Sequence, residues 1–394
     1  MLIQTGAWRE AGAAPTASSR LLDEVMARVM NDWVDTISAD ELYKRAASGV
    51  ARELDDPYST LLTPDRLRRL RESTTGRYAG IGVELDIRDG FVTVIAPIAQ
   101  TPADSAGIKP GDRILSIDGR ATTGLSMEEA QQLMRGAAGS VVRLGLVRGE
   151  QEATITLRRR EIVFHPVQRA QLLGTGIGYV ELATFNERAA REVRRAVDSL
   201  RESGARSLIL DMRENPGGLL EQGIAVADLF LDAGVAIAST RGRVAESNQT
   251  YEDVEAQLWK AMPIVVLVDS GTASAAEIVA GALQDHERAV VVGSPTYGKG
   301  SAQSVFPLRD ERALKLTTAR WFTPDGRTIE RDSTKGGITP DVEARKPAPP
   351  VSAAGRIGAP SPQPDLLADP VVARAAALLQ GVETMGQLRR KVRR

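Results

Sequence analysis

The feature that most constrains the fold is an alternation of short apolar runs and helical patterns in the second half of the 394-residue chain. Three runs have the length and composition of buried strands: Ile177–Leu182, Ser207–Asp211 and Ile264–Val268. Residues 188–201 and 219–231 instead carry the periodicity of helices. This alternation predicts an α/β core with a largely parallel sheet over residues 161–343.

Parallel sheets of this kind place their chemistry at the carboxyl ends of the strands. The first such loop is Asp211-Met212-Arg213-Glu214-Asn215-Pro216-Gly217-Gly218. The backbone N–H groups of Gly217 and Gly218 stand at the start of a helix with no side chain to cover them, as in a site that holds an oxyanion. Taken alone, the loop is better explained as a glycine-rich turn.

The second loop presents a serine in Asp269-Ser270-Gly271-Thr272-Ala273-Ser274-Ala275-Ala276-Glu277-Ile278, before a helix predicted at residues 279–285. A serine at such a junction of strand and helix can expose its hydroxyl at the sheet edge. The next N–H group, that of Ala275, then points toward a developing oxyanion. A capping serine explains the same pattern, and without a partner base it is the better interpretation of Ser274.

A nucleophilic serine needs a base, and the chain has only two histidines. His286 lies about 18 Å from Ser274 if the intervening helix is continuous, which is too far for direct proton transfer. His165 has no patterned neighbour.

Lys299 is the better candidate, in the third loop, Gly293-Ser294-Pro295-Thr296-Tyr297-Gly298-Lys299-Gly300-Ser301-Ala302-Gln303. The chain has eight lysines and forty-two arginines. Arginine stays charged, whereas a desolvated lysine can lose its proton near neutral pH. Gln303 could orient the amine. A solvated loop lysine and a polar strand-edge residue would give the same pattern.

Two segments precede the core. Residues 21–75 are predicted to be helical, with an apolar stripe suited to packing or dimerisation: Leu22, Val25, Met26, Val29 and Trp33. A second helix begins at the capping pattern Ser38-Ala39-Asp40-Glu41. Residues 1–20 lack the basic stretch and apolar block of a signal peptide, so we expect a disordered start in a chain that is either cytoplasmic or truncated.

Residues 76–160 change to a period of two, with a hairpin turn at Asp89-Gly90 and a helix capped by Ser126 and Glu129. The order of these elements resembles a PDZ domain. In that resemblance, the amides of Gly80-Ile81-Gly82 receive the terminal carboxylate of a peptide, which binds as an added strand. Taken alone, the glycines are explained by a turn, and Arg135 by a solvated charge at the end of a helix.

The core motifs together resemble the carboxy-terminal processing peptidases, or tail-specific proteases, from about residue 21 to residue 343. The matching segments are residues 211–218, 271–278, 288–293, 297–303, 317–319, 323–327 and 337–341, in the order of the family. Thr272 stands where the family commonly has serine.

The resemblance implies a multidomain α+β protein. It has an N-terminal helical segment, a β-rich PDZ domain and an α/β catalytic core similar to the crotonase and Clp protease folds. It also implies a serine endopeptidase with a Ser–Lys dyad that needs no metal or organic cofactor. By match, Ser274 is the nucleophile, Lys299 the base and Gln303 the residue that positions the lysine. Ala275, with Gly217 or Gly218, would form the oxyanion hole.

The substrates that the resemblance implies are proteins with apolar carboxyl termini, which the PDZ domain captures or senses. Arg135 is our candidate for coupling that domain to the active site. The resemblance further implies a homo-oligomer, an adaptor or regulator at the PDZ domain, and a location in the cell envelope or periplasm.

Composition and charge argue against several other classes of function and site. A formal net charge of −1 argues against binding to nucleic acid, and the absence of cysteine excludes disulfides and thiolate metal sites. No apolar run approaches the roughly 18 residues of a membrane span. Residues 344–370 predict a flexible linker rich in Pro, Ala and Ser, and residues 371–394 a short helix followed by a solvated basic tail.

Two other functions remain open from the sequence. The first is a non-catalytic scaffold that recruits carboxyl termini through its PDZ domain. The second is acyl-thioester chemistry on a crotonase-like core, which predicts binding of coenzyme A.

Overall fold

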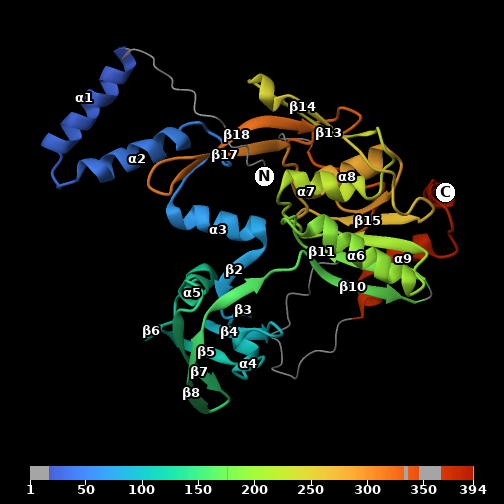
Figure 1. The fold of residues 1–394 in the computed structure, drawn as a ribbon, viewed down its shortest axis with the longest axis horizontal. Helices are drawn as coiled ribbons and strands as arrows, with labels where there is room; N and C mark the ends of the chain where they lie inside the picture. Colours follow the sequence, from blue (N-terminus) through green and yellow to red (C-terminus); the bar gives the residue numbers. More distant parts are fainter. Residues whose placement is uncertain (1–16, 175, 332–335, 346–364, 394) are drawn as a thin grey trace.

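The computed structural model describes residues 17–174, 176–331, 336–345 and 365–393. Three parts follow one another along the chain: helices at the N-terminal end, a small β-rich domain, and a larger core (Figure 1). The loops predicted to carry the chemistry all belong to the core.

The core is built on a six-stranded sheet in the order β10-β11-β12-β15-β16-β19. Its strands are β10 (Val167–Leu173), β11 (Ile177–Leu182), β12 (Ser207–Asp211), β15 (Ile264–Val268), β16 (Val290–Gly293) and β19 (Val342–Glu343). Only the β10–β11 pair is antiparallel. The predicted α/β core with a largely parallel sheet is therefore confirmed, and the ends of β12, β15 and β16 lie side by side.

Helices cover both faces of this sheet because its strands are apolar on both sides. One face packs against α6 (Ala189–Glu202), α7 (Leu220–Asp228) and α8 (Ala275–Asp285) through residues such as Leu210 and Val266. Ile209 and Val265 point to the other face, toward α9 (Pro370–Leu379) and α10 (Met385–Val392). The helix expected from residue 279 begins earlier, at Ala275.

A second sheet lies beside the first in the core, around the long strand β18 (Ala313–Phe322). Strand β17 (Ser301–Pro307) pairs with β18 along most of its length. The first part of β18 also pairs with β1 (Thr60–Leu62), and its last part pairs with β13 (Ala236–Gly242). Strand β14 (Gln249–Glu252) follows the short turn η1 (Ala245–Ser247) and extends the sheet beyond β13.

The β-rich domain has the elements that its period of two predicts. Its sheet contains β3 (Val83–Arg88), β4 (Phe91–Pro97), β5 (Arg113–Ile117), β6 (Arg120–Ala121), β7 (Val141–Arg148) and β8 (Gln151–Arg158). Its helices are α4 (Pro102–Ser105) and α5 (Met127–Met134). The predicted capping box of Ser126 and Glu129 starts α5. The strands β2 (Arg77–Gly80) and β9 (Arg160–Val163) pair in a separate two-stranded ribbon, which connects this domain to the rest of the chain at both of its ends.

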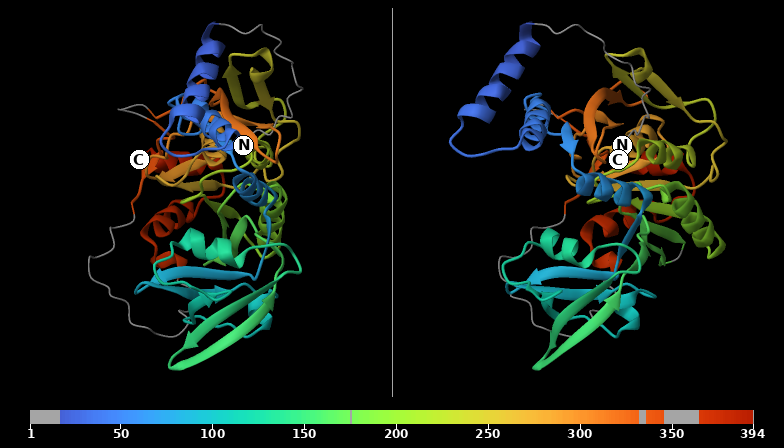
Figure 2. Two further views of the ribbon diagram at one scale, coloured as in Figure 1. Left: turned by 90° about the vertical axis from the view of Figure 1, so that its left-hand side faces the viewer. Right: turned by 60° about the vertical axis from the view of Figure 1, so that its left-hand side comes forward.

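The N-terminal helices are α1 (Ala17–Asp32), α2 (Ala39–Arg52) and α3 (Pro64–Thr75). As predicted, the Ser38 hydroxyl accepts a hydrogen bond from Glu41 N at 3.2 Å and starts α2. The apolar stripe of α1 is largely exposed, and Met26 is its only buried member. Helices α1 and α2 project away from the core (Figure 2). Residues 1–16 of the predicted disordered start lie outside the described residues. Residues 17–20 belong to α1, so the prediction of disorder was wrong for these four residues.

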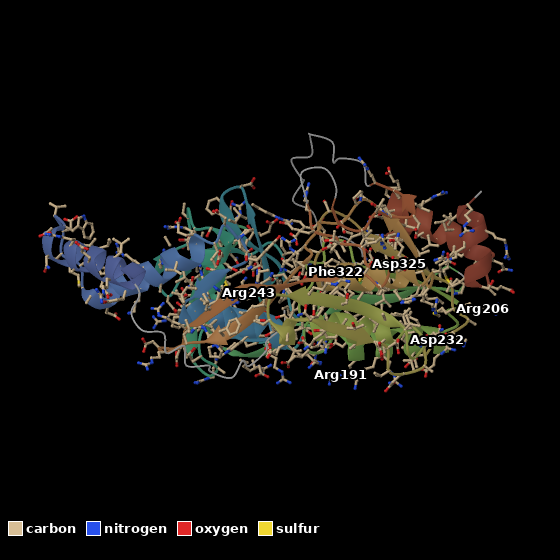
Figure 3. The ribbon with its side chains drawn as sticks, turned by 90° about the horizontal axis from the view of Figure 1, so that it is seen from above. Arg191, Arg206, Asp232, Arg243, Phe322 and Asp325 are labelled. Atoms are coloured by element: carbon tan, nitrogen blue, oxygen red, sulfur yellow. The ribbon has the colours of Figure 1, made fainter. Side chains whose placement is uncertain are left out.

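The C-terminal end contains a second helix beyond the one that the sequence predicts. Residues 346–364 of the predicted linker lie outside the described residues, but Leu366–Ala368 forms a short turn, η2, that leads into α9. The basic end forms α10, in which Leu388 is fully buried against the core. Arg390, Lys391 and Arg393 are exposed, as expected of a solvated basic end, but they lie on or next to a helix that the sequence did not predict. Figure 3 shows the red C-terminal helices at the end of the molecule opposite the blue α1 and α2.

Candidate active site

The loops that follow β12, β15 and β16 converge on one cavity of about 240 Å³. Six residues that the sequence proposed for catalysis line it: Gly217, Gly218, Ser274, Ala275, Lys299 and Gln303. Helix α3 contributes Leu70, Ser73 and Thr74 to its wall, and Lys315 comes from β18. Neither histidine lines this cavity.

Ser274 occupies the junction between β15 and α8, and its backbone is held in a rarely populated conformation. Its φ is +57° and its ψ is −118°, in the region that side chains other than glycine avoid. The Ser274 N–H donates a hydrogen bond of 2.7 Å to Oε2 of Glu277. Surrounding contacts therefore keep a strained serine at the mouth of the cavity.

Glu277 links the serine loop to the lysine loop. Its side chain is fully buried, and Oε1 accepts hydrogen bonds from Thr296 Oγ1 at 2.6 Å and Gly298 N at 2.7 Å. Oε2 accepts from Lys299 N at 3.0 Å, as well as from Ser274 N. Burial raises the pKa of Glu277, although these hydrogen bonds act in the opposite direction. One carboxylate thus fixes the backbones of the two proposed reacting residues.

The sequence analysis did not assign this role to Glu277. The available signal was its position three residues after Ser274 at a helix start, which is the spacing of a capping box. The hydrogen bonds that Glu277 accepts from the lysine loop could not be inferred, because no local sequence pattern shows that these two loops lie side by side.

The Lys299 side chain enters the cavity from a backbone that is fixed on both sides. Its carbonyl accepts a 2.9 Å hydrogen bond from Trp321 Nε1, and its N–H is held by Glu277. Its Nζ lies 4.7 Å from the centroid of the Tyr58 ring. Among the described residues, no hydrogen bond joins Lys299 Nζ to Ser274 Oγ.

Burial and a like charge both favour the neutral amine of Lys299. Burial is the larger cause of its lowered pKa, and the charge of Lys315 is the next. Three carboxyl groups oppose this shift: Glu277 on α8, Asp56 before β1, and Glu330 after β18. The net direction is the one that a lysine acting as a base requires.

Gln303 lies at the wall of the cavity and is almost fully buried. Its Nε2 donates to Ser301 Oγ at 3.1 Å and to Thr317 Oγ1 at 3.2 Å. The side chain is therefore held by its own strand β17 and by the neighbouring β18.

The glycine loop packs directly against the serine. A Cβ atom added to Gly217 would lie 2.6 Å from Ala273 O and 2.9 Å from Ala275 N, and its φ of +88° also favours glycine. The Gly217 N–H donates to Asn215 Oδ1 at 2.9 Å. The Gly217 carbonyl accepts from Phe185 N at 2.9 Å. The backbone of this loop thus runs beside the N–H proposed as an oxyanion donor.

The predicted peptide loop of the β-rich domain lines a second cavity, of about 530 Å³. Its lining includes Gly80, Ile81 and Gly82, residues 83–85 of β3, and Met134 and Arg135 at the C-terminal end of α5. His165, from the segment that enters the core, also lines it.

Arg135 joins this second cavity to α3. Its Nη1 lies 2.9 Å from Glu72 Oε2, and its guanidinium lies 5.0 Å from the centroid of the Tyr78 ring. Glu72 belongs to the helix whose Leu70, Ser73 and Thr74 line the Ser274 cavity. The two cavities are thus connected through one helix.

The described residues contain no group of three or more His, Cys, Asp or Glu side chains arranged to hold a metal ion. None of their helices is long and apolar enough to cross a membrane.

Comparisons with known proteins agree with this architecture. Residues 176–344 match the model of peptidase family S41, and residues 93–148 match a PDZ domain model. The chain is 35% identical over 338 residues to the carboxy-terminal processing protease CtpA of Bacillus subtilis, covering 85% of this chain and 71% of the relative. It is 36% identical over 331 residues to a carboxy-terminal-processing protease of Bartonella bacilliformis, covering 83% and 75%.

A solved structure described as an S41 protease from Bacteroides fragilis aligns with a TM-score of 0.54 at 18% identity, covering 86% of this chain and 92% of that one. At this identity, the likeness supports the fold.

Proposed function

The chain belongs to peptidase family S41, the carboxy-terminal processing serine proteases, and we propose that Ser274 and Lys299 are the nucleophile and general base of its active site. The observation that carries this proposal is that both side chains line one cavity while Glu277 binds both backbones. Membership of a protease family favours an enzyme over the scaffold considered from the sequence. The same membership gives no support to acyl-thioester chemistry.

In the proposed reaction, the neutral amine of Lys299 accepts the proton of Ser274 and the resulting alkoxide attacks the scissile carbonyl. The N–H of Ala275, with that of Gly217 or Gly218, stabilises the oxyanion. Of these two glycines, Gly217 would first have to release its hydrogen bond to Asn215 Oδ1. Collapse of the tetrahedral intermediate expels the amine, which takes its proton from the lysine, and leaves an acyl group on the serine. Lys299 then activates a water molecule to hydrolyse the ester.

The test of the dyad is cleavage of an unfolded model protein that ends in an apolar tail. We expect Ser274→Ala and Lys299→Met each to abolish cleavage. Ser270→Ala, an exposed serine in the same loop, and Lys260→Met, an exposed lysine, should leave the rate unchanged. Cleavage that survives Ser274→Ala would rule out the assignment of the nucleophile.

Substrate recognition is proposed to start at the PDZ groove, where the amides of Gly80, Ile81 and Gly82 receive a terminal carboxylate. Support comes from the PDZ match over residues 93–148 and from the presence of Gly80, Ile81 and Gly82 in the lining of the cavity. An apolar-tailed peptide should bind this groove, and the same peptide with an amidated carboxyl terminus should bind at least about tenfold more weakly. Equal affinities would contradict the proposed role of the amides.

We propose a homo-oligomer that uses the exposed apolar face of the N-terminal helices, around Leu22, Val25 and Trp33. The test is the molar mass in solution, by light scattering, of the wild type and of a Leu22→Ser, Trp33→Ser variant. A wild-type monomer would refute this proposal. An adaptor or regulator that docks on the PDZ domain is a separate proposal, supported only by the open groove.

The family resemblance also leads us to propose that the enzyme works in the cell envelope or periplasm. Fractionation of the source cells tests this proposal, since an enzyme confined to the cytoplasmic fraction would contradict it.

A further inference from the structure

The C-terminal segment packs on the other face of the core sheet and contacts the loop that follows β12. The proposed function gives this contact no role. Helix α9 starts at Asp369, whose Oδ1 accepts hydrogen bonds from Val371 N at 2.9 Å and Val372 N at 3.3 Å. The same carboxylate binds Arg213, with Nη1 at 3.0 Å from Oδ2 and 3.2 Å from Oδ1. Asp369 therefore caps a helix and holds a residue of the glycine loop.

Arg213 is shared between two carboxylates in a largely buried setting. Its Nη2 lies 2.6 Å from Asp211 Oδ2, and that oxygen also accepts a 2.8 Å hydrogen bond from Tyr179 OH. The side chains of Arg213 and Asp369 are 17% and 18% exposed, so water screens their pairing only weakly. Although burial acts in the opposite direction, hydrogen bonding to Arg213 and its charge keep the pKa of Asp369 below its usual value.

Arg213 directly precedes a residue with a strained backbone, so the contacts of Arg213 help to hold this loop in its conformation. Glu214 has a φ of +55°, and its N–H is held by Asp269 Oδ1 at 2.9 Å. One residue further, the Asn215 carbonyl accepts from Ala273 N at 2.9 Å. The loop is thus held by the serine loop on one side and by α9 on the other, and strained residues persist only where such contacts fix them.

We propose that Asp369 is a positioning residue for catalysis, which fixes Arg213 and thereby the loop that brings Gly217 and Gly218 beside Ser274. The proposal rests on the proposed function of these glycines and of Ser274. It assigns the C-terminal segment, residues 365–392, to the catalytic unit.

The test uses substitutions that keep the helix cap. Asparagine and serine at position 369 can still accept hydrogen bonds from Val371 N and Val372 N, but they lose the charge that pairs with Arg213. We expect Asp369→Asn and Asp369→Ser to lower kcat about tenfold and to leave KM within about twofold, since the transition state alone needs the oxyanion donors. Asp369→Glu should recover part of the loss.

The matched control is Asp365→Asn, in the same segment. Asp365 caps the turn before α9 by accepting a 3.0 Å hydrogen bond from Leu367 N, and it forms no hydrogen bond or ion pair with Arg213 in the structure. This variant should keep the wild-type kcat. All rates are normalised to the folded fraction from near-ultraviolet circular dichroism, so a variant that is partly unfolded still gives a value for kcat.

A readout beyond stability is the affinity for a peptide boronate, which mimics the tetrahedral intermediate. Its inhibition constant should rise in proportion to the fall in kcat across the Asp369 variants, whereas binding of a tail peptide to the PDZ groove should not change. In an Arg213→Met background, Asp369→Asn should have no further effect, because its action passes through Arg213.

Unchanged kcat in both Asp369→Asn and Asp369→Ser would overturn the proposal. So would an equal loss in Asp365→Asn, or an additive loss in the Arg213→Met background. Failure of the proposed function is a separate result, because it appears as cleavage by Ser274→Ala whatever residue stands at position 369.

Discussion

The Ser274 cavity and the PDZ groove are built in opposite ways. At the Ser274 cavity, buried polar side chains tie several backbone segments together, and both Asn215 and Glu277 are fully buried. The PDZ groove lies on a separate sheet, joined to the rest of the chain by the β2–β9 ribbon and by the partly exposed Arg135–Glu72 pair. Transition-state stabilisation needs donors that are fixed in advance, whereas a sensor must be able to shift when it binds.

We expect the largest effect from a substitution of Gly217, which tests whether the catalytic cavity depends on its close packing. Gly217→Ala places a Cβ atom against backbone atoms of the serine loop, so we expect kcat/KM to fall about 100-fold or more. Gly111→Ala in the β-rich domain is the matched control. Its φ of +89° is equally unfavourable, but no atom lies within 4 Å of the added Cβ.

The control should cost about 1 kcal/mol of stability, measured by urea denaturation, and leave cleavage unchanged. If both variants lose activity equally, the loss reflects backbone strain alone and the close packing of Gly217 is irrelevant to catalysis.

The next effect concerns the shared carboxylate. Glu277→Gln replaces one acceptor oxygen with an NH₂ group that faces N–H donors of the serine and lysine loops. We expect kcat to fall about tenfold and the free energy of unfolding to fall by about 1–3 kcal/mol, because buried donors lose their acceptor. Glu221→Gln, on the exposed side of α7, should change neither. A fully active Glu277→Gln enzyme would show that the two loops hold their positions without this carboxylate.

A smaller effect should appear in the pH dependence. The Lys299 amine must be neutral to act as a base, so kcat/KM should rise as pH rises through its lowered pKa. Lys315→Met removes a like charge, raises the pKa of Lys299, and should move this rise to higher pH. Lys315→Arg keeps the charge and should leave the profile in place. An unchanged profile in Lys315→Met would mean that burial alone sets the pKa of Lys299.

The smallest effect belongs to the junction of the two regions. Arg135→Ala removes the ion pair with Glu72, the contact with Tyr78 and one side chain of the groove lining, while the catalytic cavity keeps its own residues. We expect a tailed substrate to lose about 3–10-fold of its advantage over an untailed one, as for a modest coupling between sites. Arg143→Ala, on the exposed side of β7, serves as the control. If the cleavage of both substrates is unchanged, Arg135 does not couple the regions.

The sequence could predict features that depend on local patterns, but not contacts that arise only when distant segments pack together. Ser274 follows the buried strand β15 and Lys299 follows the buried strand β16. Both could be placed at one edge of the sheet, because parallel strands are recognised from local patterns and their carboxyl ends lie together. The position of Glu277 in the motif was visible, but its hydrogen bonds to Thr296 and Gly298 arise only from the fold.

Two terminal segments show why other features could not be predicted. The stripe of α1 has helical spacing, yet spacing does not state what covers the stripe, and most of it is exposed. The basic end of the chain is predominantly charged, yet α10 packs on the core through the buried Leu388 and the partly buried Met385 and Val392. Neither segment carries a local pattern that specifies its packing partner.

The short strand β1 has a consequence for solubility. It occupies the edge of β18 at residues 313–315, next to the place where β13 pairs with the same strand. A chain cut between β1 and α3 would leave those backbone groups unpaired, and an uncovered strand edge is a template for aggregation. The N-terminal segment therefore also shields the core, and a form of this enzyme that begins after residue 63 should precipitate before it loses its fold.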